Sequence, residues 1–211
     1  MATDSRRLSI LTAAEIDDLY GLPRFTEDDR RLHFDLSRTE RRLVDRVRTM
    51  SAAVHLILQL GYFKAKSQFF ALAREAVMGD LDHVLRRYFP RRKIADIRVL
   101  SKPTRLEQQR LILKLFGYRP CGAAAKAELE QKALRVAQLS TQPIFILREI
   151  LQYLTHQRVI APGYTYLQDL VGRAVTGERR RITQLLKDAL TPSVERQLEA
   201  LLVLRRSLSE A

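Results

Sequence analysis

The sequence has no tryptophan and only one cysteine, Cys121, among its 211 residues. A single cysteine excludes a disulfide within the chain and a cysteine-based zinc finger, and it is typical of a reducing compartment. Residues 1–15 lack the apolar core of a signal peptide. The most apolar stretch, residues 51–63, is too short to span a bilayer. These absences predict a cytoplasmic protein that has no membrane segment and no membrane partner.

Glycine and proline are also scarce, with 8 and 7 residues, and they separate segments of periodic apolar residues. Alternating β-branched runs joined by Asn-Gly or Asp-Gly turns, which signal hairpins, are absent. The pattern therefore predicts an all-α, multi-helix fold. We expect two helices within residues 64–88, broken near Gly79, the second of which spans residues 81–88. The other helices are expected over about residues 12–20, 26–34, 37–48, 51–63, 104–116, 123–140, 143–156, 164–175, 177–190 and 192–209.

Local sequence signals place several of the helix starts. The spacing of a capping box, in which a hydroxyl and a carboxyl group three residues apart cap each other's backbone, occurs in the pairs Thr12–Glu15, Ser37–Glu40 and Thr104–Glu107. Thr26 is expected to cap the second helix, and Asp80 the helix that ends near residue 88.

The apolar segments divide into two groups. Residues 51–63 are apolar nearly all round and should form the central helix of a first core. The helix that follows Thr104 stops at Gly117, with Pro120 just beyond it. This stop predicts two small helical subdomains, residues 1–120 and residues 121–211.

Basic residues outnumber acidic ones by 37 to 24, a formal net charge of +13, which indicates a polyanionic partner, nucleic acid rather than a membrane surface. Residues 86–119 carry 11 basic and 2 acidic side chains, whereas residues 1–85 carry 13 of each. Arginine matches phosphate geometry well. We expect phosphate contacts from a stretch in which basic residues surround Tyr88 and Phe89: Arg86, Arg87, Arg91, Arg92, Lys93, Arg98, Lys102 and Arg105. A solvated basic face is the alternative.

A second candidate is a helix-turn-helix-like element in the second subdomain. One helix should end near residue 156 and the next should start at residue 164, so the turn of seven residues is longer than the usual three or four. Recognition helices present their N-terminal residues to the DNA groove. We therefore expect groove contacts from Tyr164, Thr165, Gln168 and Arg173, and phosphate contacts from Arg179, Arg180 and Arg181. Alternatively, Tyr164 and Tyr166 only pack on the core, and the three arginines are only solvated.

Motifs for catalysis and cofactor binding are missing. The sequence has no P-loop, no G-x-G-x-x-G and no G-x-S-x-G. The histidines lie without metal-ligand spacing, at His33, His55, His83 and His156. We therefore expect no catalytic residue, no metal site and no cofactor. Cys121, with no histidine placed by sequence to activate it, is expected to be a small packing residue.

Four short motifs follow one another along residues 8–175. Residues 11–23 contain L-T-x-x-E-x-x-x-L-x-x-L-P, and residues 34–40 contain F-x-L-S-x-x-E. Residues 116–120 are F-G-Y-R-P, and residues 158–167 contain R-V-x-x-P-x-x-T-x-L. In the order and spacing of these motifs the chain resembles the N-terminal part of the Tn-3 family of replicative transposases.

The resemblance implies a helical region that binds the terminal inverted repeats of a transposon. In that family a metal-binding Asp-Asp-Glu triad, carried by a C-terminal ribonuclease-H-like domain, performs strand transfer. The chain ends before such a domain, so we expect a bacterial, nucleoid-associated protein that is not an enzyme. It would be a fragment, a truncated product or a stand-alone binder.

The leading hypothesis is a sequence-specific module for double-stranded DNA. A different class of function stays open, in which the chain is an interaction module that forms a homodimer or regulates a full-length transposase. The last expected helix, with Leu198, Leu201 and Leu202, offers a surface for this role. A third reading is an RNA-binding helical protein, which would prefer folded or single-stranded RNA to duplex DNA.

Overall fold

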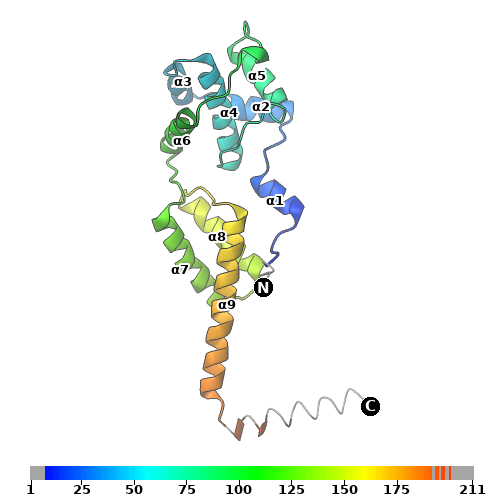
Figure 1. The fold of residues 1–211 in the computed structure, drawn as a ribbon, viewed down its shortest axis with the longest axis vertical. Coiled ribbons are helices and arrows are strands. Elements are labelled where there is room, and N and C mark those ends of the chain that lie inside the picture. Colours follow the sequence, from blue (N-terminus) through cyan, green and yellow to red (C-terminus); the bar gives the residue numbers. More distant parts are fainter. Residues whose placement is uncertain (1–7, 192, 195, 198–199, 201–211) are drawn as a thin grey trace, which may run out of the picture.

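The computed structural model describes residues 8–191, 193–194, 196–197 and 200, and this part of the chain is all-α, as predicted (Figure 1). A short 3₁₀ helix, η1, spans Ile94–Asp96. Among the described residues, β-type pairing is limited to one isolated bridge between Arg119 and Val159. The α-helices are α1 (Ala13–Tyr20), α2 (Glu27–Phe34), α3 (Arg38–Asp45), α4 (Met50–Lys66), α5 (Met78–Tyr88), α6 (Lys102–Phe116), α7 (Ala123–Leu139), α8 (Pro143–His156) and α9 (Tyr164–Ala189).

Most of the helix caps predicted from the sequence are present in the structure. The capping boxes of Thr12 and Ser37 are confirmed, and Thr26 caps α2 together with the Asp29 carboxylate. The cap expected at Thr104 is wrong. Instead, the hydroxyl of Ser101 accepts a hydrogen bond from the Thr104 N–H, and α6 begins one turn earlier, with a proline in its first turn.

Three further helix predictions are wrong. Residues 64–88 do not hold two helices of their own, because α4 continues to Lys66, residues 67–77 are not helical, and α5 runs through Gly79 without a break. Asp80 does not cap a helix, because α5 begins at Met78 and Asp80 is buried inside it. The helices expected over residues 164–175 and 177–190 are a single helix, α9. Gly172 and Gly177 have open space around them and do not interrupt the helix. The helix expected over residues 192–209, with Leu198, Leu201 and Leu202, falls largely outside the described residues.

Two hydrophobic cores organise these helices. The first core lies around α4, which is buried along most of its length, and α2, α3, α5 and α6 pack on it; we call this group the first bundle. The second core lies between α7, α8 and α9, the second bundle. Residues 10–20, including Leu11 and Ile16, pack against the second core. The N-terminal segment therefore packs its apolar side chains on the second bundle, although it precedes the first bundle in sequence. Polar contacts also join α1 to the first bundle, where the Gln68 amide donates to the Leu19 carbonyl at 3.1 Å.

Buried polar contacts fix α2 and α5 on the central helix α4. The hydroxyl of Tyr62 donates a hydrogen bond of 2.6 Å to the Asp80 carboxylate. The guanidinium of Arg30 binds the second oxygen of the same carboxylate at 2.7 Å. Burial and the adjacent Asp80 carboxylate raise the pKa of Tyr62 well above its ordinary value. One buried carboxylate thus joins three helices of the first bundle.

Two of the motifs noted in the sequence build the joint between the bundles. Residues 116–120 run beside residues 158–160, where Arg119 and Val159 form the isolated bridge. Gly117 caps α6 with φ +68°, a left-handed conformation that glycine adopts without strain. The Tyr118 ring packs edge-on against Phe63 in the first core. These motifs therefore have a structural role, because they hold the two bundles together.

The carboxylate of Glu128 ties this joint to the second bundle. It accepts hydrogen bonds from the Arg119 guanidinium at 2.7 Å and from the Tyr153 hydroxyl at 3.2 Å. These hydrogen bonds hold the pKa of the Glu128 carboxyl below its ordinary value. Side chains of α7 and α8 therefore stabilise the joint, in addition to its backbone hydrogen bonds.

Helix α1 is docked by its tyrosine, which gives a prediction that depends on pH. The hydroxyl of Tyr20 donates a hydrogen bond of 2.8 Å to the Pro162 carbonyl, and burial raises the pKa of Tyr20 from 10.0 to about 12. The variant Tyr20→Phe should lower the free energy of unfolding by about 1 kcal/mol at neutral pH. Because the pKa is raised in the folded state, this difference should be full below pH 10 and should shrink to zero within about one pH unit above it.

Urea unfolding of the two proteins from pH 7 to pH 11 measures this difference. Tyr166 provides the control, because its hydroxyl is buried without a hydrogen-bond partner among the described residues. The variant Tyr166→Phe should leave stability unchanged or raise it slightly. A Tyr20→Phe protein as stable as the unmodified chain at neutral pH would show that this hydrogen bond does not dock α1.

Candidate nucleic-acid interface

The turn between α5 and η1 presents basic residues to solvent. Arg91, Arg92 and Lys93 are all exposed there. Backbone hydrogen bonds shape the turn, since the Arg92 N–H donates to the Phe89 carbonyl and the Lys93 N–H donates to the Asp96 carboxylate. Within the described chain, the side chains of Arg91 and Arg92 make no hydrogen bond or ion pair. Their charges are therefore open to an external anion.

Tyr88 brings the basic turn next to α3. Two guanidinium groups lie over its ring, that of Arg41 at 5.6 Å and that of Arg87 at 5.7 Å from the ring centroid. Its hydroxyl donates to the Phe34 carbonyl at 2.8 Å and accepts from the Leu36 N–H at 3.2 Å. Through these contacts Tyr88 fixes the chain between α2 and α3 on the end of α5.

Helix α3 and the turn after it add basic residues that do not stand out when charge is counted by segment. The residues 1–85 are neutral as a segment, but the fold separates their charges. Glu40 of α3 is buried, where its carboxylate caps the helix and lies 3.5 Å from Lys64. The exposed arginines of this region, without a hydrogen bond or ion pair in the described part of the chain, are Arg38, Arg42, Arg46 and Arg48.

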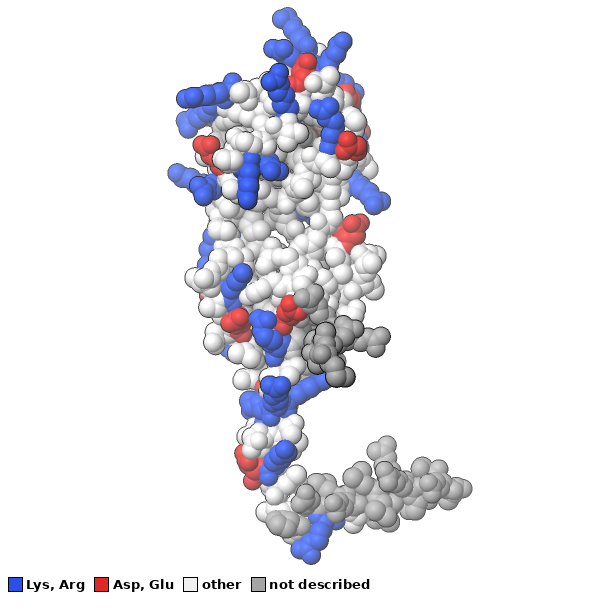
Figure 2. All heavy atoms as spheres, viewed as in Figure 1, with Lys and Arg blue, Asp and Glu red and all other residues white. Residues whose placement is uncertain are grey.

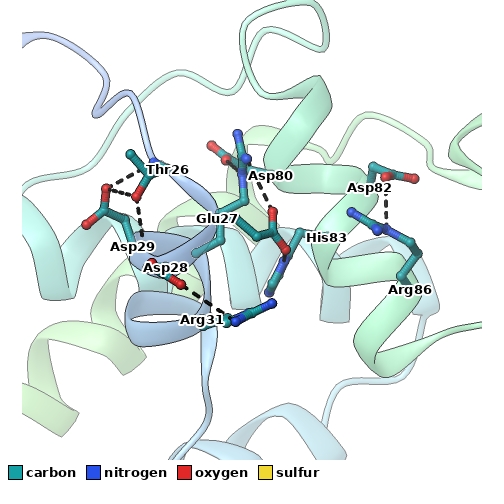
Figure 3. Close-up of polar contacts among 10 residues, drawn as sticks. Thr26, Glu27, Asp28, Asp29, Arg31, Asp80, Asp82, His83 and Arg86 are labelled. Carbon is teal, nitrogen blue, oxygen red and sulfur yellow. Dashed lines mark hydrogen bonds and ion pairs between the residues drawn. The ribbon is translucent and has the colours of Figure 1, made fainter.

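Acidic side chains also lie on the side of the first bundle that is formed by α2 and α5. Most of them bind other residues of the chain there (Figure 3). At the start of α2, Asp29 binds Thr26 and Asp28 binds Arg31. The carboxylate of Glu27 accepts from the His83 ring at 3.1 Å, which holds the pKa of Glu27 below its ordinary value. In Figure 1, α4 lies between this acidic helix α2 and the basic helix α3.

Two residues of the predicted basic stretch have partners in the chain. Arg86 forms an ion pair of 3.0 Å with Asp82, one turn earlier in α5. Arg87 donates to the Asp35 carboxylate at 2.6 Å, and this contact, together with the Tyr88 hydroxyl, raises the pKa of Arg87. Their charges are partly neutralised, so Arg91 and Arg92 are the stronger candidates.

The remaining residues of the predicted stretch lie at and before the start of α6. Lys102 and Arg105 are exposed, and so is the Arg98 side chain. Arg98 and Arg105 border a small, largely apolar cavity of about 110 Å³. His55 lines this cavity, with its Nδ1 at 2.7 Å from Gln108, and burial lowers its pKa. The structure thus places basic side chains from α3, the turn after α5, and α6 on one bundle.

The helix-turn-helix-like element is present in outline, since α8 and α9 flank the seven-residue turn 157–163. However, the first turns of α9 hold the N-terminal segment. The Tyr164 hydroxyl accepts from the Leu11 N–H at 3.1 Å, and the Gln168 amide donates to the Leu8 carbonyl at 2.7 Å. Thr165 is exposed. Two of the four expected groove residues therefore bind the N-terminal segment.

The other basic residues of α9 differ in their contacts. Arg173 pairs with Glu130 of α7 at 3.4 Å. Arg181 makes two hydrogen bonds to the buried Glu178 carboxylate, at 2.7 and 2.9 Å. Arg179 and Arg180 are exposed and line an open groove of about 780 Å³ along α9. The expected cluster of three arginines is thus a pair of exposed residues beside a neutralised one.

Figure 2 shows how these charges are distributed on one face of the molecule. Lys and Arg are most abundant at the end formed by the first bundle, where several acidic groups also lie among them; they are sparser over the middle of the molecule and reappear along the lower part of α9. On the second bundle, internal pairs such as Lys132–Glu149, at 3.0 Å, neutralise several cations. The first bundle therefore carries the strongest candidate surface for a polyanion.

Chemistry of other kinds is not indicated in the described part of the chain. No group of three or more histidine, cysteine, aspartate or glutamate side chains there is placed to hold a metal ion. Cys121 is partly buried against the second core, and burial raises the pKa of its thiol. None of the helices described has both the length and the apolar character needed to cross a membrane.

Comparison with known proteins gives one family. The family model described as "Domain of unknown function (DUF4158)" matches residues 10–174, which covers both bundles and the joint between them. No curated protein matches the chain. The match extends into α9 but ends before Gly177 and the arginines that follow it.

Proposed function

Because the chain belongs to the family described as "Domain of unknown function (DUF4158)", a description that names no activity, we propose a function from its own residues: it is a sequence-specific DNA-binding module of a transposase. The module recognises the terminal inverted repeats of a transposon and performs no catalysis itself. The motifs shared with the Tn-3 family of replicative transposases support this assignment.

One observation carries the proposal. Within the part of the chain that the structure describes, exposed cations of the first bundle whose side chains have no hydrogen bond or ion pair lie on α3 and in the turn after it, in the turn after α5, and at and before the start of α6. Several acidic side chains near them are used in caps and ion pairs, such as Asp82 with Arg86, whereas Asp45 of α3 and Glu107 of α6 are exposed. Phosphate contacts from arginine and lysine supply much of the affinity of DNA-binding proteins. A basic surface that served only to keep the protein hydrated would not need its cations to be separated from acidic side chains.

The double variant Arg91→Ala/Arg92→Ala tests the basic surface. It should lower the affinity for every duplex sequence, because these side chains are expected to contact phosphates. The plot of log affinity against log salt concentration should become flatter by about two units, one for each arginine that no longer meets a phosphate. Titration of labelled duplex with protein at several salt concentrations measures both quantities.

A matched control removes the same charge elsewhere. Arg135 and Lys187 are exposed on the second bundle, so Arg135→Ala/Lys187→Ala gives the same net charge as the double variant. The control should bind duplexes as the unmodified chain does. If both double variants lowered the affinity equally, the interaction would depend on total charge and not on this surface.

A second candidate function rests on a different observation. Beyond the second core, α9 exposes Ile182, Leu185 and Leu186, an apolar stripe at helical spacing. This stripe favours an interaction module that forms a homodimer or binds a longer transposase. Its discriminating result is a stable homodimer, or binding to a full-length transposase, with no measurable affinity for duplex DNA.

A further inference from the structure

We propose that α3 is the recognition helix, with Arg38, Thr39 and Arg42 reading base edges in the major groove of duplex DNA. This inference rests on the proposed function and moves sequence reading from the start of α9, where the sequence places it, to α3. It assigns specificity to α3 and affinity to the neighbouring cations.

The connection between α2 and α3 has the length found in helix-turn-helix proteins. Helix α2 ends at Phe34 and α3 begins at Arg38, so three residues join them. Leu36 in this link is buried, and the link is held by the Tyr88 hydroxyl. Both helices pack on α4. The second helix of the pair is therefore held rigidly at a fixed place, as base recognition requires.

Contacts on the inner side of α3 fix which of its residues face outward. Val44 is buried in the first core, and Glu40 is buried between the Ser37 N–H and Lys64. With these two residues inward, Arg38 and Arg42 lie one turn apart on the exposed side. Thr39 is exposed beside them, three residues before Arg42. The outward face thus offers two guanidinium groups and a short hydroxyl.

This set of side chains fits the chemistry of base edges. An arginine can donate two hydrogen bonds to the O6 and N7 atoms of guanine, and threonine can contact either a base edge or a thymine methyl group. Recognition helices use residues of their N-terminal part for such contacts. Arg38 and Thr39 occupy the first two positions of α3. Within the described residues, neither Arg38 nor Arg42 is held by a carboxylate of the chain.

The surroundings of α3 supply the backbone contacts that a recognition helix needs. Arg41 of α3 lies over the ring of Tyr88, three residues before Arg91 in the chain. By contrast, the start of α9 is covered by residues 8–11, which bind Tyr164 and Gln168. Helix α3 therefore combines free base-reading side chains with adjacent phosphate-binding ones, and α9 does not.

The test is selection of bound duplexes from a random-sequence pool, followed by binding measurements on the selected site. For the unmodified chain, selection should give a preferred site. The variant Arg38→Ala/Arg42→Ala should lose preference at particular base pairs, with affinity for the selected site falling roughly 10- to 100-fold. Its affinity for a scrambled duplex should fall much less. Both residues are exposed, and the helix content by circular dichroism should be unchanged.

Comparison variants separate the outcomes. Arg91→Ala/Arg92→Ala should weaken selected and scrambled duplexes alike. If Thr165→Ala/Arg173→Ala altered the preferred site and the α3 variant did not, the assignment of α3 would be overturned while the proposed function stood. Equal losses of affinity on selected and scrambled duplexes for the α3 variant would also overturn it. If the unmodified chain bound no DNA at all, the proposed function itself would fail.

Discussion

Replacing Asp80 by alanine should lower the free energy of unfolding by about 3–5 kcal/mol, the usual cost of breaking a buried ion pair from one side. Asp80 is buried, and its carboxylate accepts hydrogen bonds from both Tyr62 and Arg30. Without it, the buried Tyr62 hydroxyl loses its acceptor, and the partly buried Arg30 guanidinium keeps only its weaker contact with Glu27, at 3.5 Å. Urea unfolding followed by circular dichroism measures the change.

Asp82 gives a matched control on the same helix. It also pairs with an arginine, but the Asp82 side chain is 52% exposed, so water can replace the partner. The variant Asp82→Ala should change stability by less than about 1 kcal/mol. If the two variants had equal effects, the contacts of Asp80 would not be what holds α2 and α5 on α4.

The second large effect is expected at Gly61. An added Cβ at this position would lie 2.3 Å from two ring carbons of Phe34, which is fully buried. The variant Gly61→Ala must therefore push α2 away from α4, and overpacking of this kind costs about 1–3 kcal/mol. The gain in helix propensity, about 1 kcal/mol, offsets only part of it. Chemical unfolding should show a net loss of stability.

Gly177 in α9 is the corresponding control. A Cβ there meets no atom within 4 Å, and the residue is exposed. The variant Gly177→Ala should raise stability by about 0.4–1 kcal/mol, because alanine loses less conformational entropy than glycine in a helix. A stabilising effect of Gly61→Ala, equal to that of Gly177→Ala, would contradict the close packing of α2 on α4.

Helix type and most helix positions follow from local signals in the sequence. The capping box of Ser37 with Glu40 depends on residues three apart, and it forms as the spacing indicates. The cap of α6 is harder to place, because Ser101 lies one turn before Thr104 and has the same capping chemistry. The break expected within α9 does not occur, because Val175 and Glu178 are buried and continue the inward face past Gly177.

The candidate surface is less accessible to sequence reasoning. The basic turn with Arg91 and Arg92 is contiguous in sequence, so counting charge by segment finds it. The arginines of α3 are hidden in that count, because the acidic residues of α2 lie in the same neutral segment but fold to another side. The signal that indicates them is the amphipathic pattern of α3, in which Val44 is buried and Arg38 and Arg42 are exposed.

The contacts of α9 could not be predicted from the sequence either, because they also depend on the tertiary fold. Tyr164 and Gln168 have the chemistry of groove-binding residues, but they bind backbone atoms of residues 8–11, more than 150 residues away in sequence. Pairing over such distances depends on the whole fold. The sequence shows which side chains could bind DNA, and the tertiary structure shows which of them are already engaged.

Whether the first bundle meets the phosphates of a double helix is decided most directly by the salt dependence of binding. If six to ten of its cations contact phosphates, the affinity of the unmodified chain for duplex DNA should fall by about three to five decades between 50 and 200 mM salt. An affinity that is measurable at low salt and falls steeply along a straight log–log line is the expected result. Absence of binding at low salt, or an affinity that does not change with salt, would contradict it.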